Sequence, residues 1–368
     1  MILTILAFIF VFAVIVLFHE GGHYLLAKRF GVQVDEFAFG FPPRLWSKKK
    51  GETTYAINAI PFGGYVRLLG EDGKKDKNPA NLNNKLPWQK AIIFASGVFM
   101  NFVLAWLLLF GFYLFGGQAI IDGMWNYPGI INNQRVLITE VEEKSPAATA
   151  GIMPGDKIIS ANGFDVHNNS AVFFQVQISK KEEKPVLVKI ENENGVRESE
   201  LKTYTDKIEV DGEEMEVERI GVTMETTGKI RAQWYAAPIV ATKELGRLTK
   251  MTVVGIYDFF KTLVKTLKIS ENVGGPVAIA KITGAAAKIG FGAVIQTIIL
   301  LSIVLGVFNI LPFPALDGGH ILFLGLEKIF RREIPTEIKS IVNIIGFGLL
   351  LLLIIAVTFK DVIKFNIL

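Results

Sequence analysis

Four long apolar stretches set the pattern of this chain. Each is about 20 residues long, the length that a helix needs to cross a bilayer. They are Ile2–Tyr24, Ala91–Phe115, Phe291–Leu311 and Ile341–Phe359. Residues 118–228 are different: short alternating apolar and polar runs are separated by turn residues, which is typical of strands. The pattern predicts a multi-pass α-helical membrane protein with four transmembrane helices and one inserted α+β domain.

The composition supports this mixed architecture. Of the 368 residues, 51% are hydrophobic and 20% are charged. That is too apolar for a single soluble domain and too charged for a bare helix bundle. The net charge of +4 gives no reason to expect a nucleic acid, so the expected partner is the lipid bilayer. Cysteine is absent, which excludes disulfides and cysteine-based metal or nucleophile sites.

Lysine and arginine gather in two loops, in residues 28–90 and 328–339. Such loops favour the cytoplasmic side, so the N-terminus, residues 118–228 and the C-terminal tail are expected outside. No Lys or Arg precedes the first apolar stretch and no A-x-A-like site follows it, which favours a retained helix over a signal peptide.

Between the first two stretches, residues 25–90 contain a predicted β-hairpin. Thr53–Ile60 and Tyr65–Gly70 have strand composition, and Pro61-Phe62-Gly63-Gly64 between them is a turn signal. The segment is apolar for a cytoplasmic loop. It is predicted either to re-enter the membrane beside a cavity, where its edge can pair with an extended peptide, or to pack on the membrane surface. The pattern alone does not decide between these.

Residues 135–190 carry a recognisable series of turns. A Ser-Pro-Ala helix start, Ala150-Gly151-Ile152, Pro154-Gly155-Asp156 and Asn162-Gly163 follow one another. The series resembles a PDZ domain, which implies capture of a peptide or chain terminus by strand addition. Residues 229–290 follow, with apolar residues at helical spacing among lysines and arginines, and are predicted to form amphipathic helices on the membrane surface.

The first apolar stretch ends in His19-Glu20-Gly21-Gly22-His23, a pentapeptide of the H-E-x-x-H type. Two histidines four residues apart on a helix lie on one face and can bind one metal ion, and the glutamate between them suits a general base. Ionisable residues inside a membrane span are costly and usually functional. The placement therefore strengthens the motif as a predicted metal site.

A second polar cluster follows the third apolar stretch, in the sequence from Asn309 to His320. Pro312 and Pro314 must interrupt a helix there and admit water. Catalytic zinc usually takes three protein ligands, so Asp317 is the expected third ligand and His320 the competing one. Both clusters fall toward the inner end of their helices.

Taken together, these motifs resemble the site-2 protease family. The resemblance rests on HEGGH, on Gly97 and Asn101 in the second stretch, on the outer PDZ-like domain, and on N-x-x-P-x-P-x-L-D-G-G. Within that family, the chain is similar to the bacterial branch that cleaves membrane-bound anti-sigma factors. One departure is the single PDZ-like domain, where well-studied members of that branch in Gram-negative bacteria have two.

The resemblance implies zinc on His19, His23 and Asp317, Glu20 as catalytic acid and base, and Asn309 at the oxyanion or substrate. It also implies a set of substrate-binding residues. These are Phe62, Gly63, Gly64, Tyr65, Val66, Arg67, Asn101, Pro312 and Pro314.

The resulting hypothesis is an intramembrane zinc metalloprotease of the bacterial inner membrane. Its substrates would be single-span membrane proteins, such as anti-sigma factors or signal-peptide remnants, after a first cleavage. The active site would face the cytoplasm and the PDZ domain the outside. The predicted division is 1–24, 25–90, 91–117, 118–228, 229–290, 291–326 and 327–368. The alternatives are an inactive membrane scaffold, which the intact motifs disfavour, and a metal transporter, for which an internal repeat would be expected.

Overall fold

A computed structural model describes six ranges of the chain. They are residues 2–71, 77–117, 129–182, 184–210, 213–266 and 274–364. The start of the predicted PDZ domain, at 118–128, lies outside them. The chain divides into two compact units, each considered by itself: a helical unit of Met1–Leu109 with Leu245–Leu368, and a β unit of Phe110–Glu244.

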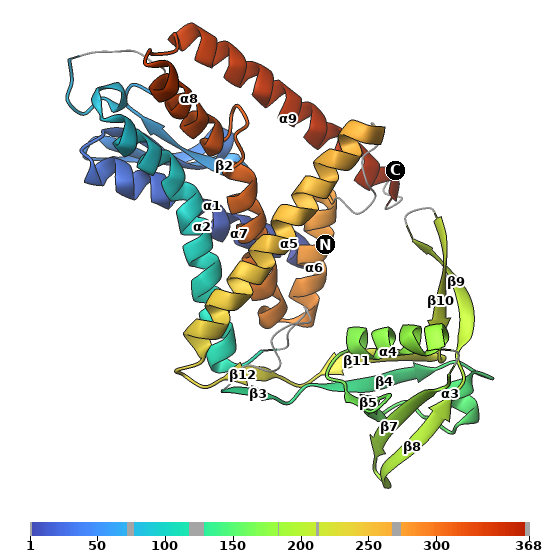
Figure 1. The fold of residues 1–368 in the computed structure, drawn as a ribbon. Coiled ribbons are helices and arrows are strands. Elements are labelled where there is room, and N and C mark those ends of the chain that lie inside the picture. The colour runs from blue at the N-terminus through green and yellow to red at the C-terminus, as the bar shows by residue number, and fades with distance from the viewer. Residues whose placement is uncertain are drawn as a thin grey trace. The chain divides into compact units, whose positions relative to one another are not determined.

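Seven long helices, seen in Figure 1, account for most of the helical unit's described residues. They are α1 (Ile2–Arg29), α2 (Pro87–Phe115), α5 (Ala237–Thr266), α6 (Pro276–Ile289), α7 (Phe291–Asn309), α8 (Asp317–Phe330) and α9 (Thr336–Lys364), with α2 and α5 continuing into the β unit. Four of them, α1, α2, α7 and α9, are long and apolar enough to cross a membrane. The four long apolar helices that the sequence predicts are therefore present. Between α7 and α8 the chain is not helical, as the two prolines require.

Helix α6 joins the core of the helical unit, which the sequence pattern did not suggest. A buried cluster combines residues of α1, α2, α6 and α7, among them Val11, Leu104, Ala286 and Ile298. A Cβ at Gly284 of α6 would lie 2.5 Å from Thr4 of α1, so the glycine allows the close approach of the two helices. Small residues have this role at membrane helix contacts.

The loop between α1 and α2 forms a sheet of two long strands, β1 (Val34–Lys50) and β2 (Thr53–Leu68). Residues 44–50 pair with 53–58. Residues 34–39 pair with 64–68 on one side, and their 36–39 part pairs with 54–57 on the other. The predicted pairing of Thr53–Ile60 with Tyr65–Gly70 is therefore wrong, because both belong to β2 and each pairs with a part of β1. The turn signal was misleading: the chain stays extended through Pro61-Phe62-Gly63-Gly64.

A buried carboxylate fixes this sheet. Glu36 of β1 is 1% exposed. Its carboxylate accepts hydrogen bonds from the side chains of Arg44 and, at 3.1 Å, Tyr65. It also forms an ion pair of 2.8 Å with Arg67. Buried carboxylates are tolerated when they are paired in this way. The contacts tie the second half of β2 to β1 and so position the strand that borders the site described below.

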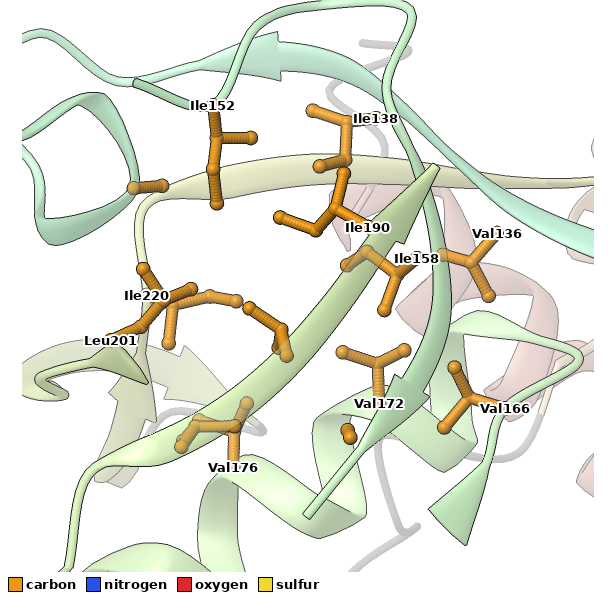
Figure 2. Packing of buried hydrophobic residues seen from close by; sticks show 14 residues of the cluster. Val136, Ile138, Ile152, Ile158, Val166, Val172, Val176, Ile190, Leu201 and Ile220 are labelled. Carbon is orange, nitrogen blue, oxygen red and sulfur yellow. The ribbon is translucent and has the colours of Figure 1, made fainter. Parts of the chain in front are cut away.

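The β unit contains a five-strand path in the order β11-β4-β5-β7-β8, with β6 beside β5. Its strands and helices are β3 (Ile130–Asn132), β4 (Arg135–Val141), α3 (Pro146–Thr149), β5 (Lys157–Ala161), β6 (Phe164–Asp165), α4 (Asn169–Glu182), β7 (Val186–Asn192), β8 (Gly195–Leu201), β9 (Tyr204–Val210), β10 (Glu213–Arg219), β11 (Val222–Thr227) and β12 (Ile230–Ala232). Figure 2 shows Val172 and Val176 of α4 packed with Ile158 and Ile190 of the sheet. The predicted order of strand, short helix, strand, helix and strand is present over β4 to β7.

Candidate metal centre

Three potential ligands from two distant segments meet inside the helical unit. His19 and His23 are one turn apart on α1, and Asp317 is the first residue of α8. The Asp317 Oδ2 atom lies 3.2 Å from His19 Nε2 and 3.5 Å from His23 Nε2. Among the residues that the structure describes, this is the only group of three or more His, Cys, Asp and Glu side chains with metal-binding spacing.

The arrangement fits a bound cation. The two Nε2 atoms are 3.3 Å apart, and Asp317 Oδ2 is buried without a hydrogen-bond partner within the described part of the chain. Three atoms that can each donate a lone pair thus converge on one point, where they repel one another unless a positive charge lies between them. Two imidazoles and one carboxylate form a donor set of catalytic zinc sites.

Helix α2 lies directly against the two histidines of the centre. The carbonyl oxygen of Ile93 on α2 lies 2.8 Å from His23 Nδ1 and can only accept a hydrogen bond from an Nδ1–H group. The Nε2 atom of His23 is therefore free to bind a metal. A Cβ at Gly97 would lie 2.3 Å from His23 Nε2 and 2.8 Å from His19 Cε1. Only a glycine therefore allows α2 to lie against both imidazoles.

Gly97→Ala is expected to lower zinc affinity by at least about tenfold, since the added methyl group must displace the imidazoles and a misoriented ligand costs that much or more. Gly111→Ala on the same helix is the matched control, because nothing lies within 4 Å of its Cβ position. Chelator competition on the two purified variants measures the difference. Equal zinc affinity in both would contradict the role given to Gly97.

Glu20 and Asn309 reach the same centre. Glu20 borders a cavity of about 260 Å³ that also contains the three ligands. Asn309, the last residue of α7, places its Nδ2 atom 3.3 Å from His19 Nε2. A carboxylate and an amide N–H group are thus held beside the metal position, which is what an acid/base group and an oxyanion donor require.

Part of β2 forms one wall of this cavity. Gly64, Tyr65 and Val66 line it, together with Leu68. A Cβ at Gly64 would lie 2.7 Å from Val16 of α1, so the strand lies close against the helix that carries the histidines. Among the other predicted substrate contacts, Arg67 pairs with Glu36 instead, and a Cβ at Gly63 would meet Phe41. The side chain of Phe62 lies outside the described residues.

The remaining predicted substrate contacts lie elsewhere. Asn101 is fully buried, with its Nδ2 atom 3.2 Å from His19 Nδ1, on the side of that ring away from the metal position. Neither Pro312 nor Pro314 borders the cavity. Pro314 is instead packed against α9, where a Cβ added at Gly346 would lie 2.6 Å from the Cβ of Pro314. The structure therefore brings the β2 residues to the metal position and leaves these three apart from it.

His320, the competing third ligand, is not in the cluster of three. Its ring is stacked on Phe94 at 4.5 Å between centroids, and burial lowers the pKa of its imidazole, which favours the neutral form. His320 and Phe94 also border a second cavity of about 440 Å³. Glu71 and Ala315 line both spaces as well, so the two cavities adjoin.

Comparison with known proteins shows the family of this chain. The sequence profile of peptidase family M50 matches residues 7–353. The chain belongs to this family. It is 33% identical over 353 residues to a Clostridium perfringens protein whose name describes a zinc metalloprotease, with 96% of each chain covered. It is 28% identical over 440 residues to the regulator of sigma-W protease RasP of Bacillus subtilis, with 98% of each covered.

Membership of family M50, also called the site-2 protease family, makes the chain a zinc metalloprotease with Zn²⁺ as its cofactor, and the four apolar helices make it a membrane protein. This favours an enzyme over the scaffold and the transporter considered above. Sequence reasoning missed two features of the site. One is the backbone carbonyl of Ile93, which has no side-chain signal. The other is the steric role of Gly97, because the Gly97…Asn101 spacing does not show how close α2 comes to the imidazoles.

Proposed function

We propose that this enzyme hydrolyses peptide bonds within membrane-spanning segments of single-span proteins. The observation that carries the proposal is the position of the three-ligand cluster: His19 and His23 lie on a candidate membrane helix, with two further candidate spans, α2 and α7, around them. A polar-lined cavity among apolar helices would give a hydrolase access to bonds that lipid otherwise protects.

In this proposal His19, His23 and Asp317 hold the zinc ion. When bound, zinc polarises the scissile carbonyl and lowers the pKa of water toward about 7. Glu20 accepts the proton of the attacking water on its carboxylate and returns it to the leaving amine. Asn309 Nδ2 donates a hydrogen bond to the oxyanion that forms on the carbonyl oxygen.

The substrate helix must unwind before its backbone can enter the cavity, since helical hydrogen bonds occupy its N–H and C=O groups. The Gly64–Leu68 part of β2 pairs with β1 on one side and borders the cavity on the other. Such an edge can pair with an extended peptide and keep it unwound. The β1–β2 sheet would thus be re-entrant rather than lie on the membrane surface.

The same proposal covers orientation and regulation. The lysine- and arginine-rich loops support an active site toward the cytoplasmic face of the bacterial inner membrane, with the β unit outside. The turn series and the order of β4 to β7 support a PDZ domain in the β unit, which binds a chain terminus or excludes substrates with large outer domains. Anti-sigma factors or signal-peptide remnants left by a first cleavage are the proposed substrates, and the name of the Bacillus subtilis relative agrees with the former.

A pair of model substrates tests this. Two single-span peptides differ only in a central Asn-Gly pair or a Leu-Leu pair, and are reconstituted with the zinc-loaded enzyme in vesicles. We expect the Asn-Gly peptide, whose helix unwinds more readily, to be cleaved faster, with the cut inside the apolar segment by mass spectrometry. A chelator should abolish both reactions. Cuts confined to the polar tails would contradict intramembrane cleavage.

A further inference from the structure

Each metal-binding imidazole needs a defined tautomer. A neutral imidazole binds metal through the nitrogen that lacks hydrogen, and its other nitrogen must donate to an acceptor. His23 meets this condition, because the Ile93 carbonyl beside its Nδ1 can only accept. For His19 the Nε2 atom faces Asp317, so the Nδ1 atom must carry hydrogen and requires its own acceptor.

The group beside His19 Nδ1 is the side-chain amide of Asn101. The structure places the amide nitrogen 3.2 Å from Nδ1, which sets two N–H donors against each other once His19 Nε2 binds metal. The Oδ1 atom of the same amide is buried and has no partner among the described residues. Oxygen and nitrogen of an amide have nearly the same shape, so a half-turn of this group places the acceptor where the donor is needed.

Asn101 is held in place for such a role. It is 0% exposed, so it does not touch substrate. Its backbone carbonyl accepts a hydrogen bond of 2.9 Å from Ser302 of α7, and a Cβ at Gly306 would lie 3.6 Å from its own Cβ. The asparagine is thus enclosed between the helix that carries the histidines and α7, with its amide facing His19.

We propose that Asn101 is a positioning residue whose Oδ1 accepts a hydrogen bond from His19 Nδ1–H and thereby fixes the tautomer and ring orientation in which Nε2 binds the metal. This rests on the proposed ligand set and corrects the substrate-binding role first given to Asn101. It makes the two histidines equivalent: each is anchored through Nδ1 by an acceptor on α2, a backbone carbonyl for His23 and a side-chain amide for His19.

Substitutions of Asn101 distinguish a role as hydrogen-bond acceptor from a role in packing alone. Asn101→Leu keeps the size and removes the acceptor, so we expect a 10- to 100-fold loss of zinc affinity, the usual cost of losing such a partner. Asn101→Asp restores an acceptor, and we expect affinity within about threefold of wild type or tighter, because carboxylates commonly orient zinc-bound histidines. Ser302→Ala, which leaves the acceptor in place, is the matched control and should stay near wild type.

Chelator competition on the purified full-length variants gives these affinities, and thermal unfolding shows that each variant is folded. Equal affinity in the Leu variant and wild type, or equal losses in the Leu and Asp variants, would overturn the proposal. If wild type itself binds no zinc, the proposed ligand set fails instead, so the two failures are distinguishable.

A second measurement uses the wild-type protein alone. The chain has only four histidines, so ¹⁵N-histidine NMR of the zinc-loaded enzyme resolves each ring. We expect two rings with metal on Nε2 and hydrogen on Nδ1. Metal on Nδ1 of His19 would contradict the role of Asn101 even if every variant were unstable.

Discussion

Glu20→Gln is expected to abolish peptide-bond cleavage and to leave zinc binding intact. Glutamine has the same shape but cannot accept a proton, and loss of general acid–base catalysis costs about 10²- to 10⁴-fold in rate. Glu20 borders the cavity but is not one of the three converging ligands, so the metal should stay bound. Zinc content per chain and cleavage of the single-span peptide, measured on the same preparation, check both parts.

The rival base in this cavity is Glu71, whose Oε2 atom accepts a hydrogen bond of 3.0 Å from the backbone N–H of Leu68. This contact ties one oxygen of the carboxylate to the end of β2. We therefore expect Glu71→Gln to change the rate by no more than about threefold, since the side-chain oxygen of glutamine can accept the same hydrogen bond. If Glu71→Gln were inactive and Glu20→Gln active, the assignment of the base would be reversed.

Asp317→Asn is expected to lose zinc and activity together. The substitution keeps the shape of the side chain but removes the negative charge that faces two imidazole nitrogens at 3.2 and 3.5 Å. Loss of a direct ligand should exceed the 10- to 100-fold cost of losing a group that only orients a ligand. Chelator competition and metal analysis on the purified protein measure the loss.

His320→Asn is the companion variant, since His320 was the competing third ligand and lies outside the cluster. It should retain zinc, because its ring is stacked on Phe94 rather than directed at the ligand position. Retained zinc in the Asp317 variant with loss in the His320 variant would show that the histidine, not the aspartate, completes the site.

The features that could be predicted from the sequence are those that depend only on residues close together in the chain. Helices α1, α2, α7 and α9 follow from runs of apolar residues, and the spacing of His19 and His23 follows from the helical repeat. The irregular segment after Asn309 follows from its prolines. These features need only neighbouring residues, and the structure contains each of them.

Features that depend on contacts between distant segments were not accessible in the same way. The partner of the second half of β2 is residues 34–39, and no local pattern distinguishes it from the adjacent stretch 53–60. The roles of Gly97 and Asn101 appear only when α2 lies against α1, because one is a missing Cβ and the other a buried acceptor. The sequence gives the residue types but does not show which helices lie against each other.

The separation of the ligands along the chain has a consequence for biosynthesis. His19 and His23 leave the ribosome well before Asp317, which the chain carries in a much later segment. Until α7 and α8 are made, the two imidazoles lack both the Asp317 carboxylate and the Asn309 amide. With the proposed ligand set, the newly made chain therefore cannot hold zinc through all three side chains until α8 has been synthesised.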